Sequence, residues 1–277
     1  MAAVAVTVVD DRGVAVNFDR PPQRIVSLLP SVTELVCELG QCSRLVGVDK
    51  DSNFPAMVQK LPIVGGVLDP SIEAVVQLRP DVVLLATYSN AGDRLQALGI
   101  KTFALQARTY ADVQKSLVKL GQVLRVEDPQ RILRDIDTGV AMAGQSLPAS
   151  VHGVRVYFEI DPAPYAAGEG SFIGETLSRL GVRNIVTANM GLFPKLNPEF
   201  VVRANPDVIM VGPTSGDAVA ERPGWSQIRA IKEHRICMFT AQQEAVLIRP
   251  GPRMAEAARH VAECLTRVYA STSTAKQ

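Results

Sequence analysis

Two glutamates, Glu73 and Glu199, occupy the same position in two copies of one short sequence pattern. Residues 71–84 and 197–210 each begin with Ser or Asn, have the glutamate two places later, and continue with a short apolar stretch, Pro-Asp and a run of β-branched residues. A carboxylate in the first turn of a helix is favoured by the helix dipole, so each glutamate can be simply part of a helix cap. The functional alternative is a matched pair of exposed anions, one on each half of the molecule, that docks on basic residues of a partner.

Aromatic residues are the second group with a possible role in binding. They make up only 5% of the chain, yet several fall in or beside turn-rich segments that follow predicted strands: Phe54, Tyr88, Tyr165, Phe193 and Trp225. In open α/β sheets, ligands bind outside the carboxyl ends of the strands, where such segments lie. The aromatic rings therefore predict a site for a large, flat, partly apolar ligand, although each ring taken alone could equally anchor its own loop.

The polar residues give no support to catalysis. Arg249 opens an Arg-Pro-Gly-Pro-Arg sequence before the last predicted helix, where it either contacts a ligand or lies in solvent. The chain has no Gly-x-Ser-x-Gly sequence, its three histidines are far apart, and its four cysteines lack Cys-x-x-Cys spacing. We therefore predict that the protein is not an enzyme and has no catalytic centre, no metal site and no resident cofactor.

The overall composition is that of a soluble globular protein. Of the 277 residues, 47% are apolar and 21% charged, and the formal net charge is +1. Lys and Arg are not clustered, which argues against a nucleic-acid partner, and no apolar run reaches the roughly 18 residues of a membrane span. The first residues show no signal peptide, which on its own predicts the cytoplasm. Cys37 and Cys42 either form a short-loop disulfide in an oxidising compartment or are small buried residues.

Alternating strand and helix patterns predict an α/β fold in two halves. In the first half a hairpin at 3–9 and 14–18 is followed by strands at 24–29, 45–48, 81–86 and 101–105, with helices at 31–40, 72–78 and 93–98. The Ser31-x-x-Glu34 sequence predicts a capping box for the first of these helices. The second half has strands at 154–160, 184–187, 207–211 and 235–239, with helices at 172–180, 225–231 and 252–269. This alternation indicates parallel sheets covered by helices.

Two further helical patterns, at 109–125 and 129–147, lie between the halves. Ile132, Ile136 and Val140 recur four residues apart and form an apolar stripe along the second of them. No Gly/Ser-rich linker is present, so this segment reads as a stiff connector. We predict two Rossmann-like lobes, at 1–107 and 151–277, joined by the helical segment 108–150.

Several segments together resemble one known family of transport proteins. They are Arg24–Glu34, Leu45–Val48, Pro62–Gly66, Glu73–Val83, Gly170–Ile173 and Arg249–Arg253. As a set, over about residues 22–268, they resemble the helical-backbone (class III) substrate-binding proteins of ABC importers, most of all the cobalamin-binding member. The resemblance implies two α/β lobes on a single long backbone helix, with a ligand held in the cleft between them. It also implies a periplasmic protein, or a lipid-anchored one, whose leader is not part of this chain.

The resemblance also implies partners and site residues. Glu73 and Glu199 match the glutamates that engage arginines of the membrane permease. The aromatic positions that hold the corrin ring match Phe54, Tyr88, Tyr165 and Phe193, and a polar ligand contact matches Arg249. The expected partners are therefore a cobalt corrinoid such as cobalamin and the transmembrane permease, with the protein acting as a monomer.

The chain departs from the cobalamin-binding member at several places. Val67 stands where that member has tryptophan, and two of the matched aromatic positions carry Phe or Tyr where tryptophan is common. The loop at 240–248 is longer, and the region 177–180 lacks the cysteine that would pair with Cys264. These differences bear on the ligand more than on the fold or the transport role.

Haem or an iron-siderophore, bound by the same fold, is the alternative ligand. A siderophore site is expected to present several Arg or Lys side chains, which are sparse in the predicted loops. Haem is more often held by a Tyr or His ligand, so Tyr88 and Tyr165 keep haem open. A small α/β enzyme is the remaining alternative, and no acid–base pair supports it.

Overall fold

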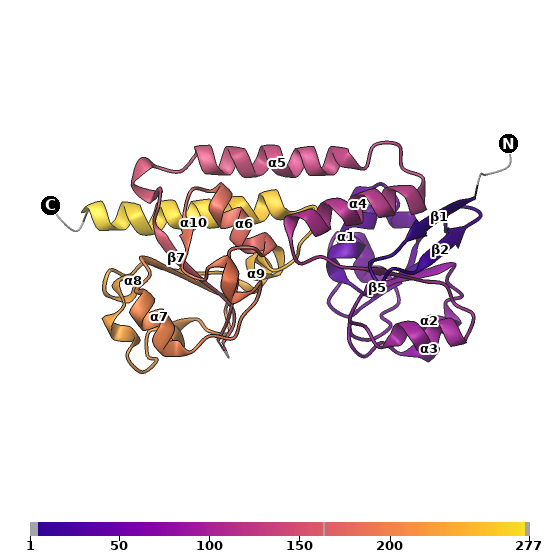
Figure 1. Ribbon diagram of the computed structural model, residues 1–277, viewed down its shortest axis with the longest axis horizontal. Helices are drawn as coiled ribbons and strands as arrows, with labels where there is room; N and C mark the ends of the chain where they lie inside the picture. The colour runs from indigo at the N-terminus through magenta and orange to yellow at the C-terminus, as the bar shows by residue number, and fades with distance from the viewer. Residues whose placement is uncertain (1–4, 163, 275–277) are drawn as a thin grey trace. The chain divides into compact units, whose positions relative to one another are not determined.

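The computed structural model describes residues 5–162 and 164–274, which fall into two compact units (Figure 1). The first unit extends to Ala107 and includes Ala111–Arg134; the second comprises Arg108–Tyr110 and the chain from Asp135 onward. Each unit contains a parallel sheet with helices, which confirms the predicted α/β class. The separate connecting segment at 108–150, with the domain boundaries drawn from it, stays a prediction.

The first unit is built on a four-stranded parallel sheet. Its order is β4 (Leu45–Val48), β3 (Ile25–Ser27), β5 (Val82–Ala86) and β6 (Thr102–Leu105). These strands are short runs of β-branched and aliphatic residues, and β5 is buried along its whole length, as expected for a parallel sheet covered on both faces. Between these strands lie the helices α1 (Pro30–Glu38), α2 (Ile72–Gln77) and α3 (Ala91–Ala97), with 3-10 turns η1 (Cys42–Arg44) and η2 (Ala56–Lys60).

In the N-terminal hairpin, β1 (Val6–Val9) with β2 (Ala15–Phe18), one buried carboxylate contacts both the turn and the sheet of this unit. Asp10 accepts hydrogen bonds from the backbone N–H of Arg12 and Val14 within the turn and from that of Ala104 on β6. The hairpin turn is therefore fastened to the edge strand of the sheet.

The capping box predicted at Ser31 and Glu34 is wrong. Helix α1 begins one residue earlier, at Pro30, and its N-cap Leu29 makes no side-chain capping bond. Proline at the first helical position presets the backbone angle, so the helix starts without a polar cap. Ser31 and Glu34 are both buried instead.

The second unit has a five-stranded sheet. Along its main path the order is β11 (Ile236–Met238), β10 (Val208–Val211), β7 (Arg155–Asp161) and β8 (Tyr165–Ala166), and β9 (Arg183–Asn184) also pairs with β7. All pairs are parallel except β7 with β8. The helices are α6 (Phe172–Arg179), α7 (Pro198–Ala204), α8 (Arg229–Lys232), α9 (Ala241–Leu247) and α10 (Met254–Thr274), with 3-10 turns η3 (Ala149–Val151), η4 (Ala188–Met190), η5 (Asp217–Val219) and η6 (Trp225–Gln227).

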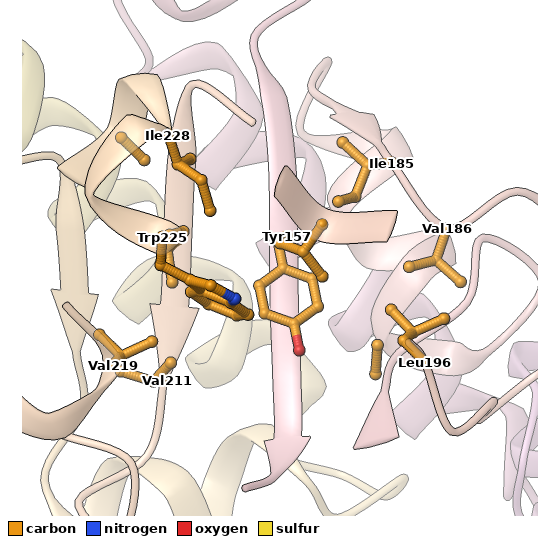
Figure 2. Close-up of a cluster of buried hydrophobic side chains, with 12 residues drawn as sticks. Tyr157, Ile185, Val186, Leu196, Val211, Val219, Trp225 and Ile228 are labelled. Carbon is orange, nitrogen blue, oxygen red and sulfur yellow. The ribbon is translucent and has the colours of Figure 1, made fainter. Parts of the chain in front are cut away.

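Trp225 is central to the core of this second sheet (Figure 2). The indole is fully buried and meets the Tyr157 ring edge-on, with centroids 5.8 Å apart and planes at 74°. Around the two rings lie Ala166, Ile185, Val186, Leu196, Val201, Ile209, Val211, Val219, Ile228 and Ala230. Trp225, expected as a loop aromatic at the ligand site, is therefore a core residue.

Two helices, α4 (Tyr110–Leu124) and α5 (Gln130–Gln145), correspond to the predicted segments 109–125 and 129–147. On α5 the predicted stripe of Ile132, Ile136 and Val140 is buried. The described helices include none that is long and apolar enough to cross a lipid bilayer.

Other predictions about individual elements were wrong. The strand expected at 184–187 is reduced to β9, and the segment 240–248, expected as a loop, contains helix α9. Thr240 caps α9 in a capping box with Gln243, a Thr-x-x-Gln signal that was present in the sequence. The 225–231 helix is split between η6 and α8.

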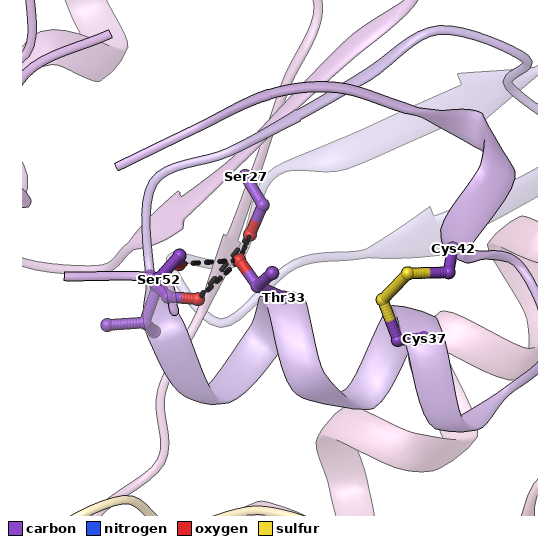
Figure 3. The surroundings of a disulfide bond; sticks show 6 residues. Ser27, Thr33, Cys37, Cys42 and Ser52 are labelled. Atoms are coloured by element: carbon purple, nitrogen blue, oxygen red, sulfur yellow. Dashed lines mark hydrogen bonds between the residues drawn. A yellow bond between two sulfur atoms is a disulfide. The ribbon is translucent and has the colours of Figure 1, made fainter. Parts of the chain in front are cut away.

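All four cysteines are bonded, one disulfide in each unit. Cys37 pairs with Cys42 at the end of α1 (Figure 3), and Cys237 on β11 pairs with Cys264 on α10. The partner of Cys264 is thus a residue of strand β11 and not a residue of the region 177–180, where the resemblance places it. Stable disulfides are typical of proteins that mature in an oxidising compartment.

Candidate functional site

The two copies of the repeated pattern form equivalent helix starts. Ser71 Oγ accepts a hydrogen bond from the N–H of Ala74 at 3.2 Å, and Asn197 Oδ1 accepts one from the N–H of Glu199 at 2.9 Å. The capping role therefore belongs to Ser71 and Asn197. Both glutamates, Glu73 on α2 and Glu199 on α7, are exposed.

The Pro-Asp part of the repeat has an internal role. The Asp81 carboxylate accepts the backbone N–H of Arg24 at 2.9 Å, and Asp207 accepts that of Arg155 at 3.0 Å. Each aspartate thereby fixes the amino end of the strand beside its own, β3 or β7. This bond explains why the Pro-Asp spacing is repeated. Among the described residues, the exposed glutamates make no comparable contact with the sheet, and Glu73 accepts a 3.5 Å bond from Gln77.

In the first unit, two predicted ligand aromatics lie after the carboxyl ends of strands. Tyr88 follows β5 and is 61% exposed, and Phe54 follows β4 and is 42% exposed. The strand order β4-β3-β5 brings their loops to the same edge of one sheet. Large aromatic side chains with this much surface in water are available for a ligand.

A chain of buried hydroxyls lies beside the loop that carries Phe54. Thr33 Oγ1 lies 2.8 Å from Ser27 Oγ and 2.9 Å from Ser52 Oγ (Figure 3). Ser52 Oγ in turn donates to Asp49 Oδ2 at 2.5 Å. Ser27 ends β3, Thr33 lies on α1, and Asp49 and Ser52 begin the loop that carries Phe54. The cluster therefore ties this loop to the strand and the helix beneath it.

Asp49 is the charged end of this chain. Burial raises the pKa of its carboxyl group above the ordinary value, only partly offset by the bonds from Ser52 and from the backbone N–H of Asp51. A protonated Asp49 can donate to Ser52, while an ionised one accepts from it, so the chain of hydroxyls can satisfy both forms by reversing its bonds.

In the second unit, Tyr165 and Phe193 are brought together by backbone pairing. The segment around Tyr165 runs beside that around Phe193, joined by the bonds Leu196 N–H to Pro164 carbonyl, Ala166 N–H to Pro194 carbonyl and Gly168 N–H to Leu192 carbonyl, at 2.8 to 3.0 Å. Tyr165 is 39% exposed. Phe193 is half-buried, tilted against Phe172 with centroids 6.2 Å apart, and the Arg108 guanidinium lies 5.9 Å from its centroid.

Arg249 lies in a later segment of the same unit. It is half-buried in the short connection between α9 and α10, one helix beyond the carboxyl end of β11. The seven predicted site residues thus form two sets, one in each unit. Phe54, Tyr88 and Glu73 belong to the first, and the others to the second.

One cluster in the second unit was missed by sequence reasoning. Glu159, near the end of β7, is buried and accepts hydrogen bonds from Tyr157 Oη, Ser215 Oγ and both terminal nitrogens of Arg222. Burial, reinforced by the neighbouring Glu159 carboxylate, raises the pKa of the Tyr157 phenol, which stays a neutral donor. The residues of the Glu159 cluster are spread over some sixty positions of the sequence, so no local pattern could have identified the cluster.

Metal-binding groups of side chains are not found in the described part of the chain. Within residues 5–162 and 164–274, no three His, Cys, Asp or Glu side chains are arranged to hold a metal ion. The arrangement suits non-covalent binding, with aromatic surface at the loops and buried polar clusters that hold those loops in place.

Comparison with known proteins identifies one matching family model, described as "Periplasmic binding protein", over residues 25–242. An ABC transporter substrate-binding lipoprotein, YvrC of Bacillus subtilis, whose function is uncharacterised, is 29% identical over 94% of this chain and 85% of its own length. A cobalamin-binding protein of Halobacterium salinarum is 27% identical over 91% of this chain and 71% of its own.

Solved structures show the same fold. The periplasmic vitamin B12-binding protein BtuF of Vibrio cholerae has a TM-score of 0.71 at 21% identity, covering 90% of this chain and 98% of its own. The periplasmic haem-binding protein RhuT of Roseiflexus has a TM-score of 0.75 at 23% identity, covering 89% and 98%. These similar proteins bind and transport ligands and are not enzymes, as predicted for this chain.

Proposed function

We propose that this chain, which belongs to the periplasmic binding protein family and is a class III substrate-binding protein of an ABC transporter, captures cobalamin or a related corrinoid and delivers it to the transporter's membrane permease. In this proposal the loops after the strands of both units hold the ligand. The protein works in the periplasm or is lipid-anchored outside the cell membrane, where the disulfides Cys37–Cys42 and Cys237–Cys264 would persist.

The observation that carries the choice of ligand is the exposure of three large aromatic side chains at the loops. Tyr88, Phe54 and Tyr165 keep 61%, 42% and 39% of their surface in water. A corrin ring is broad and partly apolar, so stacking against such side chains supplies contact area while a few polar groups fix its orientation. Arg249 is proposed as one of these polar contacts. Cobalamin-binding relatives over nearly the whole chain support the same choice.

Haem is the second candidate, and a specific observation favours it. Tyr88 follows β5 and Tyr165 begins β8, and both side chains are exposed, so each presents a phenol at the surface of its unit. A phenolate oxygen is a known axial ligand of haem iron. Structures of haem-binding proteins share the fold, and at 23% identity this similarity shows the fold alone.

Calorimetric titration of the full chain distinguishes these ligands. Cyanocobalamin, cobinamide, haemin and a ferric hydroxamate siderophore are titrated separately under the same conditions. The proposal predicts that cyanocobalamin or cobinamide binds with a Kd below about 1 μM, equivalent to about 8 kcal/mol, and that haemin and the siderophore bind much more weakly. Tight binding of haemin alone, accompanied by a tyrosinate-to-iron absorption band that is lost in Tyr88→Phe or Tyr165→Phe, would replace the corrinoid with haem.

The glutamates of the repeat are assigned to delivery. Glu73 and Glu199 start equivalent helices, are exposed, and are not needed for capping, because Ser71 and Asn197 already accept the helix N–H groups. Exposed anions at matched positions suit docking on basic side chains of the permease, where charge complementarity sets orientation and the rate of encounter.

A further inference from the structure

The loop that follows β10 in the second unit, residues 212–224, is built from tight local turns. Its backbone bonds run from Gly216 N–H to Gly212 carbonyl, Val219 N–H to Ser215 carbonyl, and Glu221 N–H to Ala218 carbonyl. Such turns fix the local shape of a loop but not its position on the sheet. The position must come from side chains that reach the strands.

Two of those side chains converge on one buried carboxylate. Arg222 donates from its two terminal nitrogens to the two oxygens of Glu159, at 2.6 and 2.8 Å, and Ser215 donates to the same group. Glu159 lies on β7, the strand beside β10, and is only 3% exposed. A bidentate Arg–carboxylate pair is strong and directional, so Arg222 fixes the later part of the loop to β7. The Ser215 bond fixes the earlier part to the same carboxylate.

Further contacts hold the Arg222 side chain in this geometry. Its guanidinium lies 4.7 Å from the centroid of the Trp225 ring, in the orientation of a cation–π contact. Tyr157 Oη donates to Glu159 at 2.8 Å, on the same carboxylate oxygen that one Arg222 nitrogen contacts. Trp225 and Val219 are both fully buried in the core of this unit (Figure 2). The inner face of the loop is therefore fixed, whereas Pro213, Thr214 and Ala218 on its outer face are exposed.

We propose that Arg222 and Glu159 are positioning residues for ligand binding: they hold the loop 212–224 in the one conformation in which its exposed face contacts the ligand. The proposal rests on the proposed function, because the loop follows the carboxyl end of β10, where ligands of open α/β sheets bind. A loop that is already fixed before binding loses little conformational entropy when the ligand binds. The smaller entropy loss raises the affinity.

The pair also has the chemistry of a fastening that is not easily replaced. Removing Arg222 leaves a buried carboxylate with its charge unpaired, which then draws in water or a proton and releases the loop. Lysine keeps the charge but not the two-pronged geometry, so Arg222→Lys is expected to restore only part of the fastening. Glu159→Gln keeps the shape of the side chain and removes the charge.

Trp225 provides a built-in reporter. It is the only tryptophan in the chain, it is fully buried, and its ring lies against Arg222. Release of Arg222 opens the indole to water, which shifts its fluorescence emission to longer wavelength. A change elsewhere in the protein has no other tryptophan through which to appear.

The test compares five proteins: wild type, Arg222→Ala, Arg222→Lys, Glu159→Gln and the control Arg229→Ala. Arg229 forms a 2.6 Å ion pair with Asp207, just before the amino end of β10, in the same unit but at the opposite edge of the sheet. Hydrogen exchange of peptides covering 212–224, Trp225 emission and cyanocobalamin affinity are measured on each. In Arg222→Ala we expect exchange of the loop to be faster by about tenfold or more, a red-shifted emission, and affinity weaker by about tenfold, the effect of losing a hydrogen bond to a charged group.

Arg222→Lys should lie between wild type and Arg222→Ala in both affinity and loop exchange, and Arg229→Ala should match wild type in both. Unchanged loop exchange in Arg222→Ala overturns the fastening. Faster exchange with wild-type affinity overturns the positioning role and leaves a purely structural one. If wild type itself binds no corrinoid, the proposed function fails while the exchange data still decide whether Arg222 and Glu159 hold the loop.

Should Arg222→Ala not fold, Ser215→Ala removes one of the loop bonds. Loop exchange in Ser215→Ala is expected to be about threefold faster and affinity about threefold weaker than in wild type.

Discussion

The two units are alike on the outside and different underneath. Each has an exposed glutamate in the first turn of a helix, Glu73 or Glu199, and each has a loop aromatic beyond the carboxyl end of a strand. Beneath the loops, however, the first unit uses an uncharged chain of hydroxyls that ends at Asp49, and the second uses the ion pair of Glu159 with Arg222. The features that a partner could touch are repeated, whereas the means of holding the loops are not.

This difference has a physical basis. A partner that binds both units at once requires matched groups at matched helix starts, so the exposed positions are constrained together. A loop only needs to be fixed to its own sheet, and any fully satisfied buried polar cluster achieves this. The comparison therefore separates the residues that we propose to dock on the permease from the residues that hold the fold of each unit, and the following changes probe that separation.

The largest difference in stability between the units is expected from their disulfides. Cys237 and Cys264 are 27 positions apart and Cys37 and Cys42 only 5. In the chain-entropy model a longer closed loop stabilises more. Replacing Cys237 and Cys264 by alanine should therefore lower the free energy of unfolding by about 3–4 kcal/mol, and replacing Cys37 and Cys42 should lower it by about 2 kcal/mol. Urea denaturation of the two double variants measures this. Equal losses would show that strain or local packing, and not loop length, sets the contribution.

Replacing the aspartate of the Pro-Asp sequence should lower the free energy of unfolding by similar amounts in the two units. Asp81 accepts the N–H groups of Gln23 and Arg24, while Asp207 accepts the N–H of Arg155 and the guanidinium of Arg229. Asp81→Ala and Asp207→Ala should each lower the free energy of unfolding by about 1–3 kcal/mol, because backbone donors lose a charged acceptor. Thermal unfolding provides the measurement. A change in only one of the two variants would break the equivalence of the repeated segments.

Comparing variants of the helix caps with variants of the glutamates tests whether the glutamates have a capping role. Ser71→Ala and Asn197→Ala should each cost about 1 kcal/mol, because a helix N–H loses its acceptor. Glu73→Ala and Glu199→Ala should each change the free energy of unfolding by less than about 0.5 kcal/mol, as expected for exposed positions outside the fold's contacts. Denaturation curves for the four variants distinguish the residues. Glutamate variants as unstable as the cap variants would return the glutamates to a capping role.

The buried carboxylate of Asp49 should make the stability of the protein depend on pH. The pKa of Asp49 is raised by burial, so between its ordinary value near 3.8 and the raised value the folded state holds more protons than the unfolded state. The free energy of unfolding therefore falls as pH rises through that window and levels off above it. Asp49→Asn should remove this slope. Stability curves of wild type and Asp49→Asn from pH 3 to pH 8 test it, and an unchanged slope in the variant would assign the effect to other groups.

Much of the fold could be predicted from the sequence because its signals are local. The β-branched runs of β3, β5 and β10, the turn signals and the repeated Pro-Asp pattern predicted two α/β units correctly. Helix α9 carried a local Thr240-x-x-Gln243 signal that was overlooked. Strand β8, by contrast, exists through pairing with β7 and could not be read from two residues.

The candidate site was only partly predictable for the same reason. Exposed residues at helix starts and loops, such as Glu73 and Tyr88, follow from the pattern of elements. Trp225 was misplaced because a short 3-10 turn carries it into the core, where it packs on Tyr157. The Glu159 cluster joins residues that are far apart in the sequence, and the Cys237–Cys264 pair depends on the packing of α10 against β11. Such contacts are products of the tertiary fold.

The most direct test of the central claim is uptake of cyanocobalamin by the transporter's permease reconstituted in vesicles, supplied with wild type or with Glu73→Ala plus Glu199→Ala. Affinity is measured on the same preparations, and Glu38→Ala, which removes another exposed glutamate, is the control. We predict that the double variant loses uptake by about a hundredfold or more, because two charged contacts with the permease are gone, while its Kd stays within about twofold of wild type. Loss of affinity in the double variant, or uptake at the wild-type rate, would contradict the docking role of Glu73 and Glu199.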